Sequence, residues 1–183
     1  MNIERVLFTE EQIQARIREV AAEIAKRYEG RPSIKLIGVL KGSVFFLTAL
    51  AREITVPVKI DFLGISSFSS SGSSGLVRIA KDLDESIEGE DVLLIEDIVD
   101  TGFTTRYLMQ TLAARGPNSV AICTLLDRTM RRIVQIPVDF RCFEIPDRFV
   151  VGFGLDHMQL YRNLPYIAVM SPVELAAMPQ KSV

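Results

Sequence analysis

The stretch Val92-Leu93-Leu94-Ile95-Glu96-Asp97-Ile98-Val99-Asp100-Thr101-Gly102-Phe103-Thr104-Thr105 decides the fold of this 183-residue chain. Its first four residues are apolar, which is typical of a short strand that is buried on both faces. Three carboxylates come after this strand, and a small, hydroxyl-rich turn then leads into a segment with helical spacing. A strand followed by such a turn and a helix predicts part of a parallel α/β sheet.

The same turn predicts a ligand site with two different halves. The N-terminus of a helix offers unpaired N–H groups to a phosphate. The carboxylates of Glu96, Asp97 and Asp100 can hold sugar hydroxyls, a hard metal ion or a proton. Turns in any α/β protein favour Asp, Thr and Gly, but this preference explains one or two of these residues rather than the whole run. The pattern therefore indicates a phosphorylated sugar as the ligand.

The rest of the chain alternates between strand-like and helical segments. A capping box at Thr9 predicts a helix with apolar residues from Ile13 to Ile24 at helical spacing, and a second helix is expected over 43–52. Further strands are expected at 34–40, 58–65, 76–80, 120–126, 140–145, 149–153 and 166–170, with a helical fragment near 173–178. This alternation predicts an α/β fold, a mostly parallel twisted sheet with helices on both faces, in a single domain over 1–183.

Residues 66–75 are a low-complexity segment of serine and glycine with one phenylalanine. Composition alone is typical of a flexible linker. A linker needs a domain on each side, and neither flank is large enough to be one. A mobile lid over a ligand site fits the segment better.

Composition excludes several classes of function. The chain is 48% hydrophobic with a formal net charge of -2 and a pI of about 5.5, which disfavours a nucleic-acid partner. No apolar stretch reaches the length of a membrane span, and no leader begins the chain, so a cytoplasmic location is expected. Cys123 and Cys142 lie in apolar runs and are expected to be buried thiols without metal-ligand spacing, and His157 is the only histidine.

Unusual residues also follow other predicted strands. Lys41-Gly42 comes directly after the strand at 34–40, where a cation and a glycine allow close approach to an anion. Arg128 follows the strand at 120–126, and the run Asp147 to Asp156, with Arg162 six residues later, follows the next. Each could be an ordinary loop residue, and an aromatic such as Phe149 is more often core than a stacking surface for a base. In parallel sheets, however, ligands bind at the carboxyl ends of strands, so these residues are expected to meet there.

The segment 92–105 closely resembles the phosphoribosyl-pyrophosphate motif of the type I phosphoribosyltransferases. Over about 34–172 the chain resembles the bacterial hypoxanthine (hypoxanthine-guanine) branch of that family. This finer resemblance rests on Leu40-Lys41-Gly42, the serine-rich loop, the run Asp147 to Asp156 and the block Tyr161 to Tyr166. It implies the family fold, with a small hood lobe from the N- and C-terminal segments, a lid over 66–75, and a homodimer or homotetramer.

The resemblance implies the transfer of a phosphoribosyl group from phosphoribosyl pyrophosphate to N9 of a 6-oxopurine. The base would be hypoxanthine, and also guanine, and the products IMP or GMP and pyrophosphate, as in purine salvage. It implies Asp100 as the acceptor of the purine N7 proton, and Mg²⁺ as cofactor near Glu96, Asp97 and Asp156. The substrate-binding residues that it implies are Lys41, Gly42, Glu96, Asp97, Thr101, Gly102, Phe103, Thr104, Thr105, Arg128, Phe149, Val150, Asp156 and Arg162.

The same resemblance divides these residues among the parts of the substrates. The segment Thr101 to Thr105 would bind the 5′-phosphate, and Lys41, Gly42 and Arg162 the pyrophosphate. Phe149 would stack on the purine, and backbone groups of Val150 would contact its edge.

Two positions depart from the family pattern. Arg128 stands where the family usually has a lysine that donates to the purine O6 atom, and a planar guanidinium is not equivalent to an ammonium. Phe68 stands in the lid where a tyrosine is common. The preference among hypoxanthine, guanine and xanthine therefore stays open, as does a phosphoribosyltransferase for another base such as uracil. A regulator that binds RNA is a further alternative, which would require Arg128, Arg131, Arg132 and Arg148 to form one basic surface.

Overall fold

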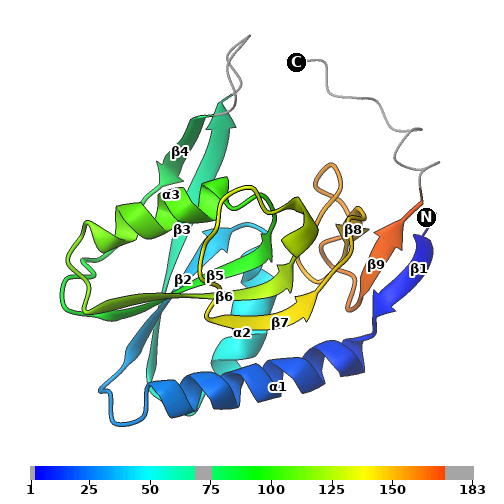
Figure 1. Ribbon diagram of the computed structural model, residues 1–183. Coiled ribbons are helices and arrows are strands. Elements are labelled where there is room, and N and C mark those ends of the chain that lie inside the picture. The colour runs from blue at the N-terminus through cyan, green and yellow to red at the C-terminus, as the bar shows by residue number, and fades with distance from the viewer. Residues whose placement is uncertain (1–2, 69–75, 172–183) are drawn as a thin grey trace.

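The computed structural model describes residues 3–68 and 76–171 (Figure 1). Six strands form the main sheet in the order β4-β3-β2-β5-β6-β7. Five of them run parallel, and β4 pairs antiparallel with β3 at one edge. The strands are β2 (Ile34–Leu40), β3 (Val58–Phe68), β4 (Leu76–Lys81), β5 (Asp91–Val99), β6 (Ser119–Asp127) and β7 (Phe140–Glu144). The predicted mostly parallel α/β sheet is confirmed.

Helices cover both faces of this sheet, as predicted. Figure 1 shows α1 (Glu10–Arg27) and α2 (Ser43–Glu53) on one face and α3 (Phe103–Ala113) on the other. Side chains alternate along a strand, so Leu36 of β2 packs in the core under α1 and α2, while Ile37 packs in the core under α3. The buried surface on both faces explains why the central strands are almost entirely apolar.

The first helix begins as its sequence predicts. The Thr9 hydroxyl accepts from the backbone N–H of Gln12, and the Gln12 side chain accepts from the backbone N–H of Thr9 at 2.9 Å. This reciprocal capping box satisfies two backbone donors that a helix N-terminus leaves unpaired. The buried residues Ile13, Ile17, Val20, Ala21 and Ile24 form the stripe that faces the sheet.

A second, three-stranded antiparallel sheet joins the two ends of the chain. Its order is β1-β9-β8, with β1 (Ile3–Phe8), β8 (Val150–Val151) and β9 (Ile167–Met170). Figure 1 shows β1 and β9 side by side, beyond the carboxyl ends of β6 and β7. The strand β1 was not predicted, and β8 is shorter than the predicted strand 149–153. The chain turns at Gly152, which has φ +101°, and this ends β8.

Two predicted boundaries were wrong. The strand expected over 92–95 runs on to Val99, because Ile98 and Val99 continue the ladder with β6. Glu96 and Asp97 therefore lie within β5, and only Asp100 lies in the turn. The lid was expected from residue 66, but 66–68 belong to β3 and pair with β4. The rest of that segment and the helical fragment near 173–178 lie outside the described residues.

Candidate active site

A cleft of about 290 Å³ opens at the carboxyl ends of β2, β3 and β5. Ligands bind at this edge of open parallel sheets, where the N-termini of the following helices also meet. The cleft brings together eleven of the residues expected from the sequence: Lys41, Gly42, Glu96, Asp97, Asp100, Thr101, Gly102, Thr104, Thr105, Asp156 and Arg162. Four others, Phe103, Arg128, Phe149 and Val150, do not line it.

The phosphate-binding half is the turn from Asp100 to the start of α3. Gly102 adopts a left-handed conformation with φ +90° and caps α3 without a side-chain hydrogen bond. A Cβ at this position would lie 2.5 Å from the Val134 carbonyl oxygen, so the turn requires glycine. The hydroxyl residues Thr104 and Thr105 line the cleft. Unpaired backbone N–H groups and hydroxyls at a helix N-terminus suit a phosphate.

Two carboxylates on β5 form the opposite half. Glu96 is only 5% exposed, and burial, with a smaller effect of the Asp97 charge, raises its pKa well above the usual range. Burial also raises the pKa of Asp97 to about 6, which the backbone N–H of Ile98 and the charge of Arg162 partly counteract. Carboxyl groups with raised pKa values are stabilised in their charged form by a bound cation or by hydroxyl donors. The pair therefore suits a ribose or a hard metal ion.

The two carboxylate oxygens of Asp100 have different surroundings. Arg128 Nη1 lies 3.4 Å from Oδ2, and Arg131 Nη1 lies 3.5 Å from the same atom. Oδ1 is buried and has no hydrogen-bond partner among the described residues. One oxygen is thus held by arginines, while the other has an acceptor capacity that no described residue uses.

The turn Lys41-Gly42 closes one side of the cleft. The Leu40–Lys41 peptide bond is cis. A Cβ on Gly42 would lie 1.6 Å from Asp97 Oδ2, so glycine alone lets this turn approach the carboxylate. Gly154, with φ +100°, also packs closely against this turn, since a Cβ there would lie 2.1 Å from the Gly42 carbonyl oxygen. The Lys41 side chain stays exposed, with Nζ 3.5 Å from Gln159 Oε1.

Arg162 is fixed at the rim of the cleft. Its Nη2 forms an ion pair with Asp156 Oδ1 at 2.7 Å, and its Nη1 donates to the Gly154 carbonyl at 2.7 Å. Gln159 Oε1 accepts from both Lys41 Nζ, at 3.5 Å, and Arg162 Nη2, at 3.3 Å, and so bridges the two cations. Asp156 in turn accepts from the Gln159 backbone N–H. The result is a preorganised cationic edge in which one arginine, Arg162, and one lysine, Lys41, can receive an anion.

Residues expected to contact a base lie just beyond Asp100. Arg128 is 7% exposed, and its Nη2 donates to the Arg148 carbonyl at 2.7 Å, which links Asp100 to the segment that precedes Phe149. The Phe149 side chain is 41% exposed, and His157 packs against its ring in a T-shaped geometry at 5.3 Å. Val150 is buried in β8 opposite Val169. A planar ligand can stack on the exposed Phe149 ring, one residue after the carbonyl that Arg128 binds.

Reasoning from the sequence missed four polar residues around the site. Arg131 pairs with Asp100, Gln159 bridges Lys41 and Arg162, and His157 supports Phe149. The fourth is Arg132, whose Nε donates to the Asp100 carbonyl. Local composition gave no signal for Arg131, Arg132 or the contact of Gln159 with Lys41, because these contacts join segments more than 30 residues apart, whereas His157 and Phe149 lie close in the sequence. Phe103, which was expected to bind substrate, is 50% exposed at the first turn of α3.

The donor set fits a magnesium ion that shares its ligands with a substrate. Within the described ranges, no group of three or more histidine, cysteine, aspartate or glutamate side chains is placed to hold a metal by itself. Glu96, Asp97 and Asp156 offer only oxygen donors, and the first two are destabilised as charged groups by burial. Mg²⁺ commonly takes one or two carboxylates and completes its shell with phosphate oxygens and water.

The chain belongs to the phosphoribosyl transferase domain family, whose model matches residues 7–157. Within this family it is 46% identical over 170 residues to the hypoxanthine-guanine phosphoribosyltransferase of Streptococcus mutans, covering 92% of this chain and 94% of the relative. It is 48% identical over 164 residues to the hypoxanthine phosphoribosyltransferase of Salmonella typhimurium, covering 88% and 92%. The crystal structure of a hypoxanthine phosphoribosyltransferase from Staphylococcus aureus superposes with a TM-score of 0.90 at 44% identity, covering 94% of each chain.

Proposed function

We propose that this chain transfers the phosphoribosyl group of phosphoribosyl pyrophosphate to N9 of hypoxanthine or guanine. The observation that carries the proposal is the cleft itself, in which a phosphate-binding helix N-terminus faces the carboxylates of β5. Relatives that cover most of the chain carry the names of enzymes for these two bases. The products would be IMP or GMP and pyrophosphate.

The residues of the cleft fit the parts of the sugar donor. The turn Thr101 to Thr105 would bind the 5′-phosphate through backbone N–H and hydroxyl groups. Glu96 and Asp97 would hold the ribose hydroxyls from the strand beneath. Lys41 and Arg162 would neutralise the charge that develops on the leaving pyrophosphate, which is the part of an oxocarbenium-like reaction where electrostatic stabilisation counts most.

The base would be held between Phe149 and Arg128. Stacking on Phe149 orients the purine, and Arg128 can donate to the O6 carbonyl oxygen of hypoxanthine or guanine. Adenine presents an amino donor at that position, so the same guanidinium would reject it. Asp100 Oδ1, which has no partner among the described residues, would accept the proton of purine N7 as the glycosidic bond forms.

We further propose Mg²⁺ as the cofactor, held by Glu96, Asp97 and Asp156 together with oxygens of the donor. The chemistry that the ion supplies when bound is neutralisation of charge on the pyrophosphate. Isothermal titration of phosphoribosyl pyrophosphate with and without Mg²⁺ tests this assignment independently of turnover. Equal affinity under both conditions would contradict it.

The experiment that tests the function is pyrophosphate release in the presence of Mg²⁺ and phosphoribosyl pyrophosphate. Hypoxanthine, guanine, xanthine, adenine and uracil are offered in parallel at equal concentration. Release with hypoxanthine or guanine and none with adenine is expected. Faster pyrophosphate release with xanthine or uracil would reassign the base. No pyrophosphate release with any base, although the sugar donor binds, would refute the proposed function.

The structure gives little support to RNA binding by the arginines after β6. Arg128 pairs with Asp100 and Arg132 pairs with Asp127, and both arginine side chains are less than 10% exposed. Arg131 is more exposed but lies 3.8 Å from Asp147. Arg128 and Arg132 are thus buried against carboxylates, so of the four arginines that this alternative requires only Arg131 and Arg148 are exposed to bind phosphates.

We also propose a single-domain chain that assembles as a homodimer or homotetramer and acts in the cytoplasm. Among the residues that the structure covers, no helix is long and apolar enough to cross a membrane. Phe45 on α2 is 41% exposed beside a groove that Phe153 also lines, which supports α2 as an interface. Light scattering after gel filtration tests the assembly, and Phe45→Glu is expected to reduce it.

A further inference from the structure

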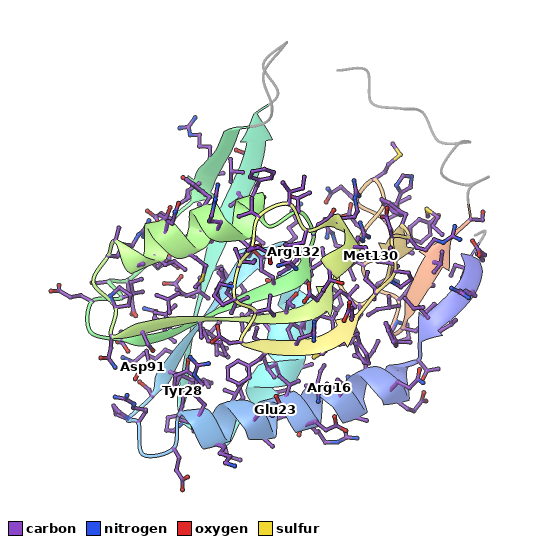
Figure 2. The ribbon with its side chains drawn as sticks, in the orientation of Figure 1. Arg16, Glu23, Tyr28, Asp91, Met130 and Arg132 are labelled. Atoms are coloured by element: carbon purple, nitrogen blue, oxygen red, sulfur yellow. The ribbon has the colours of Figure 1, made fainter. Side chains whose placement is uncertain are left out.

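The guanidinium of Arg132 connects a buried carboxylate to the main chain of Asp100. Its Nε donates to the Asp100 carbonyl oxygen at 3.0 Å, and its Nη2 forms an ion pair with Asp127. The side chains of Arg132 and Asp127 are 8% and 4% exposed. Figure 2 labels Arg132 where the side chains crowd beside the carboxyl ends of the central strands, and labels Met130, two residues earlier in the chain, to its right. We propose that Arg132, held by Asp127, is a positioning residue that fixes Asp100 for catalysis, and the proposal rests on the function proposed above.

The loop that carries Arg132 clamps the catalytic turn at more than one point. The backbone N–H groups of Ile133 and Val134 both donate to the Thr101 carbonyl oxygen at 3.0 Å. The same loop leaves no space beside Gly102, where a Cβ would meet the Val134 carbonyl oxygen at 2.5 Å. Two consecutive carbonyls of the turn, those of Asp100 and Thr101, are therefore bound by one segment. Of these hydrogen bonds, only the one to Asp100 depends on a side chain.

Asp127 gives Arg132 a fixed point within the sheet. It is the last residue of β6 and pairs in register with Val99, the residue before Asp100. Its carbonyl accepts from the backbone N–H of Ile145, and Arg128 N–H donates to the Val99 carbonyl. The carboxylate is thus placed by strand pairing on both sides. Arg132 connects this fixed carboxylate to the carbonyl of Asp100. Asp100 follows Val99, the last residue of β5 that pairs with β6.

The chemistry of the link requires an arginine. A guanidinium is planar and presents donors in several fixed directions, so it can bind a carbonyl through Nε and a carboxylate through Nη2 at once. A lysine ammonium in the same place reaches one of the two partners only. Because both charges are desolvated, loss of Asp127 would leave the Arg132 guanidinium without a carboxylate, and loss of Arg132 would leave Asp127 with only the more exposed Arg141.

Arg132 differs in this respect from the two arginines that contact the Asp100 carboxylate. Arg128 and Arg131 lie against Oδ2, whereas Arg132 binds the main chain and does not line the cleft. Its substitution is therefore expected to lower kcat and to leave the binding of the sugar donor nearly unchanged. A residue with a merely structural role would lower the melting temperature without this separation.

The test compares Arg132→Lys with a matched control at the same carboxylate. Arg141 Nη1 lies 3.1 Å from Asp127 Oδ2, but Arg141 is 46% exposed and its ion pairs are with Asp127 and Glu144 rather than with the catalytic turn, so Arg141→Gln is the control. For each protein we would measure kcat and KM with hypoxanthine, the Kd of phosphoribosyl pyrophosphate by calorimetry, and Tm. A misplacement of the reacting group by a fraction of an ångström to 1 Å predicts a fall in kcat of about 10- to 100-fold for Arg132→Lys. The donor Kd is expected to stay within about twofold, and Arg141→Gln to behave like the wild type.

A second variant guards against a failure of Arg132→Lys to fold. Asp127→Asn keeps the shape of the anchor and removes its charge, and it is expected to lower kcat in the same direction by about 10-fold. The double variant is expected to be no slower than Arg132→Lys alone, since both changes break one link. An unchanged kcat in either folded single variant, or an equal loss in Arg141→Gln, would overturn the positioning role. A wild-type chain without any turnover would instead refute the proposed function, and this inference with it.

Discussion

Replacement of Gly42 by alanine tests whether the close approach of the Lys41 turn to Asp97 matters for activity. Gly42 has φ -60° and ψ -39°, which alanine adopts without strain, so any effect comes from the added methyl group. That methyl would lie 1.6 Å from Asp97 Oδ2 and 2.5 Å from its Cγ, whereas real contacts of Cβ atoms essentially never fall below 3.0 Å. The carboxylate or the turn must therefore move by about 1.4 Å.

The expected loss follows from this displacement. A shift of about 1 Å in a group that positions a substrate costs on the order of 100-fold in rate, so kcat/KM for phosphoribosyl pyrophosphate should fall by about that factor. Asp97 can rotate within the open cleft at the cost of an unfavourable rotamer, about 1 kcal/mol. The free energy of unfolding should therefore change by no more than about that amount. The assay is pyrophosphate release over a range of donor concentrations, combined with urea unfolding.

A double variant separates the steric explanation from a general effect on the turn. Asp97→Ala removes the atoms that the new methyl would meet. If the clash is the cause, Gly42→Ala adds little further loss in the Asp97→Ala background, and the two effects are strongly non-additive. Gly42→Ala activity within a few-fold of the wild type, or a double loss equal to the product of the single losses, would refute the reasoning.

Four further outcomes are expected. Asp100→Asn should lower kcat by about 100- to 10,000-fold while donor binding measured by calorimetry survives, because a carboxamide cannot accept the N7 proton; near-normal turnover would remove Asp100 from this role. Arg128→Lys should remain active with hypoxanthine, at a lower kcat because its contact with the Asp100 carboxylate changes, and should change the ratio of guanine to xanthine use, since an ammonium donates from a different position; identical ratios in steady-state assays would contradict its place in the base pocket. Burial raises the pKa of Asp97 to about 6, so its charge destabilises the fold progressively as the pH rises through 6. Asp97→Asn should therefore raise the free energy of unfolding at pH 8, by roughly 1 to 2 kcal/mol, and should have little effect near pH 4; the same gain at both pH values would be evidence against this. Burial raises the pKa of Cys142 to about 12 and that of Cys123 well above its usual range, so neither thiol should react with a disulfide reagent at pH 8 until the protein is unfolded.

Helices and strands could be predicted where a few neighbouring residues carry the signal, such as a capping motif or an uninterrupted apolar run. The capping box at Thr9 and the apolar run of β2 specify a helix start and a buried strand without reference to the rest of the chain. The cluster at the carboxyl strand ends could also be predicted, because in a parallel sheet those ends share one edge. Nine of the expected residues meet in the cleft for this reason, and Asp156 and Arg162 join them from the segment after β8.

Features that depend on distant pairing could not be predicted in this way. The strand β1 is short and largely exposed, and its partner β9 lies at the other end of the chain, so its own residues give no strand signal. The end of β5 was misplaced because Ile98 and Val99 are strand residues only through β6. The contact of Arg132 with the Asp100 carbonyl, 32 residues earlier, belongs to the same class. Each requires the sheet to exist before the two partners are neighbours.

The end of β5 divides the site into a rigid part and an adjustable part. Glu96 and Asp97 lie inside the ladder with β6, so strand pairing fixes their backbones whether or not a ligand is bound. Asp100 is the first residue beyond the ladder, and side chains hold it instead: Arg132 at its carbonyl and Arg128 at its carboxylate. Because Arg128 also faces the proposed base pocket, a substitution there that alters base preference must alter the orientation of Asp100 as well. Specificity and proton transfer in this chain are therefore expected to change together, whereas changes on β5 should affect binding of the sugar donor separately.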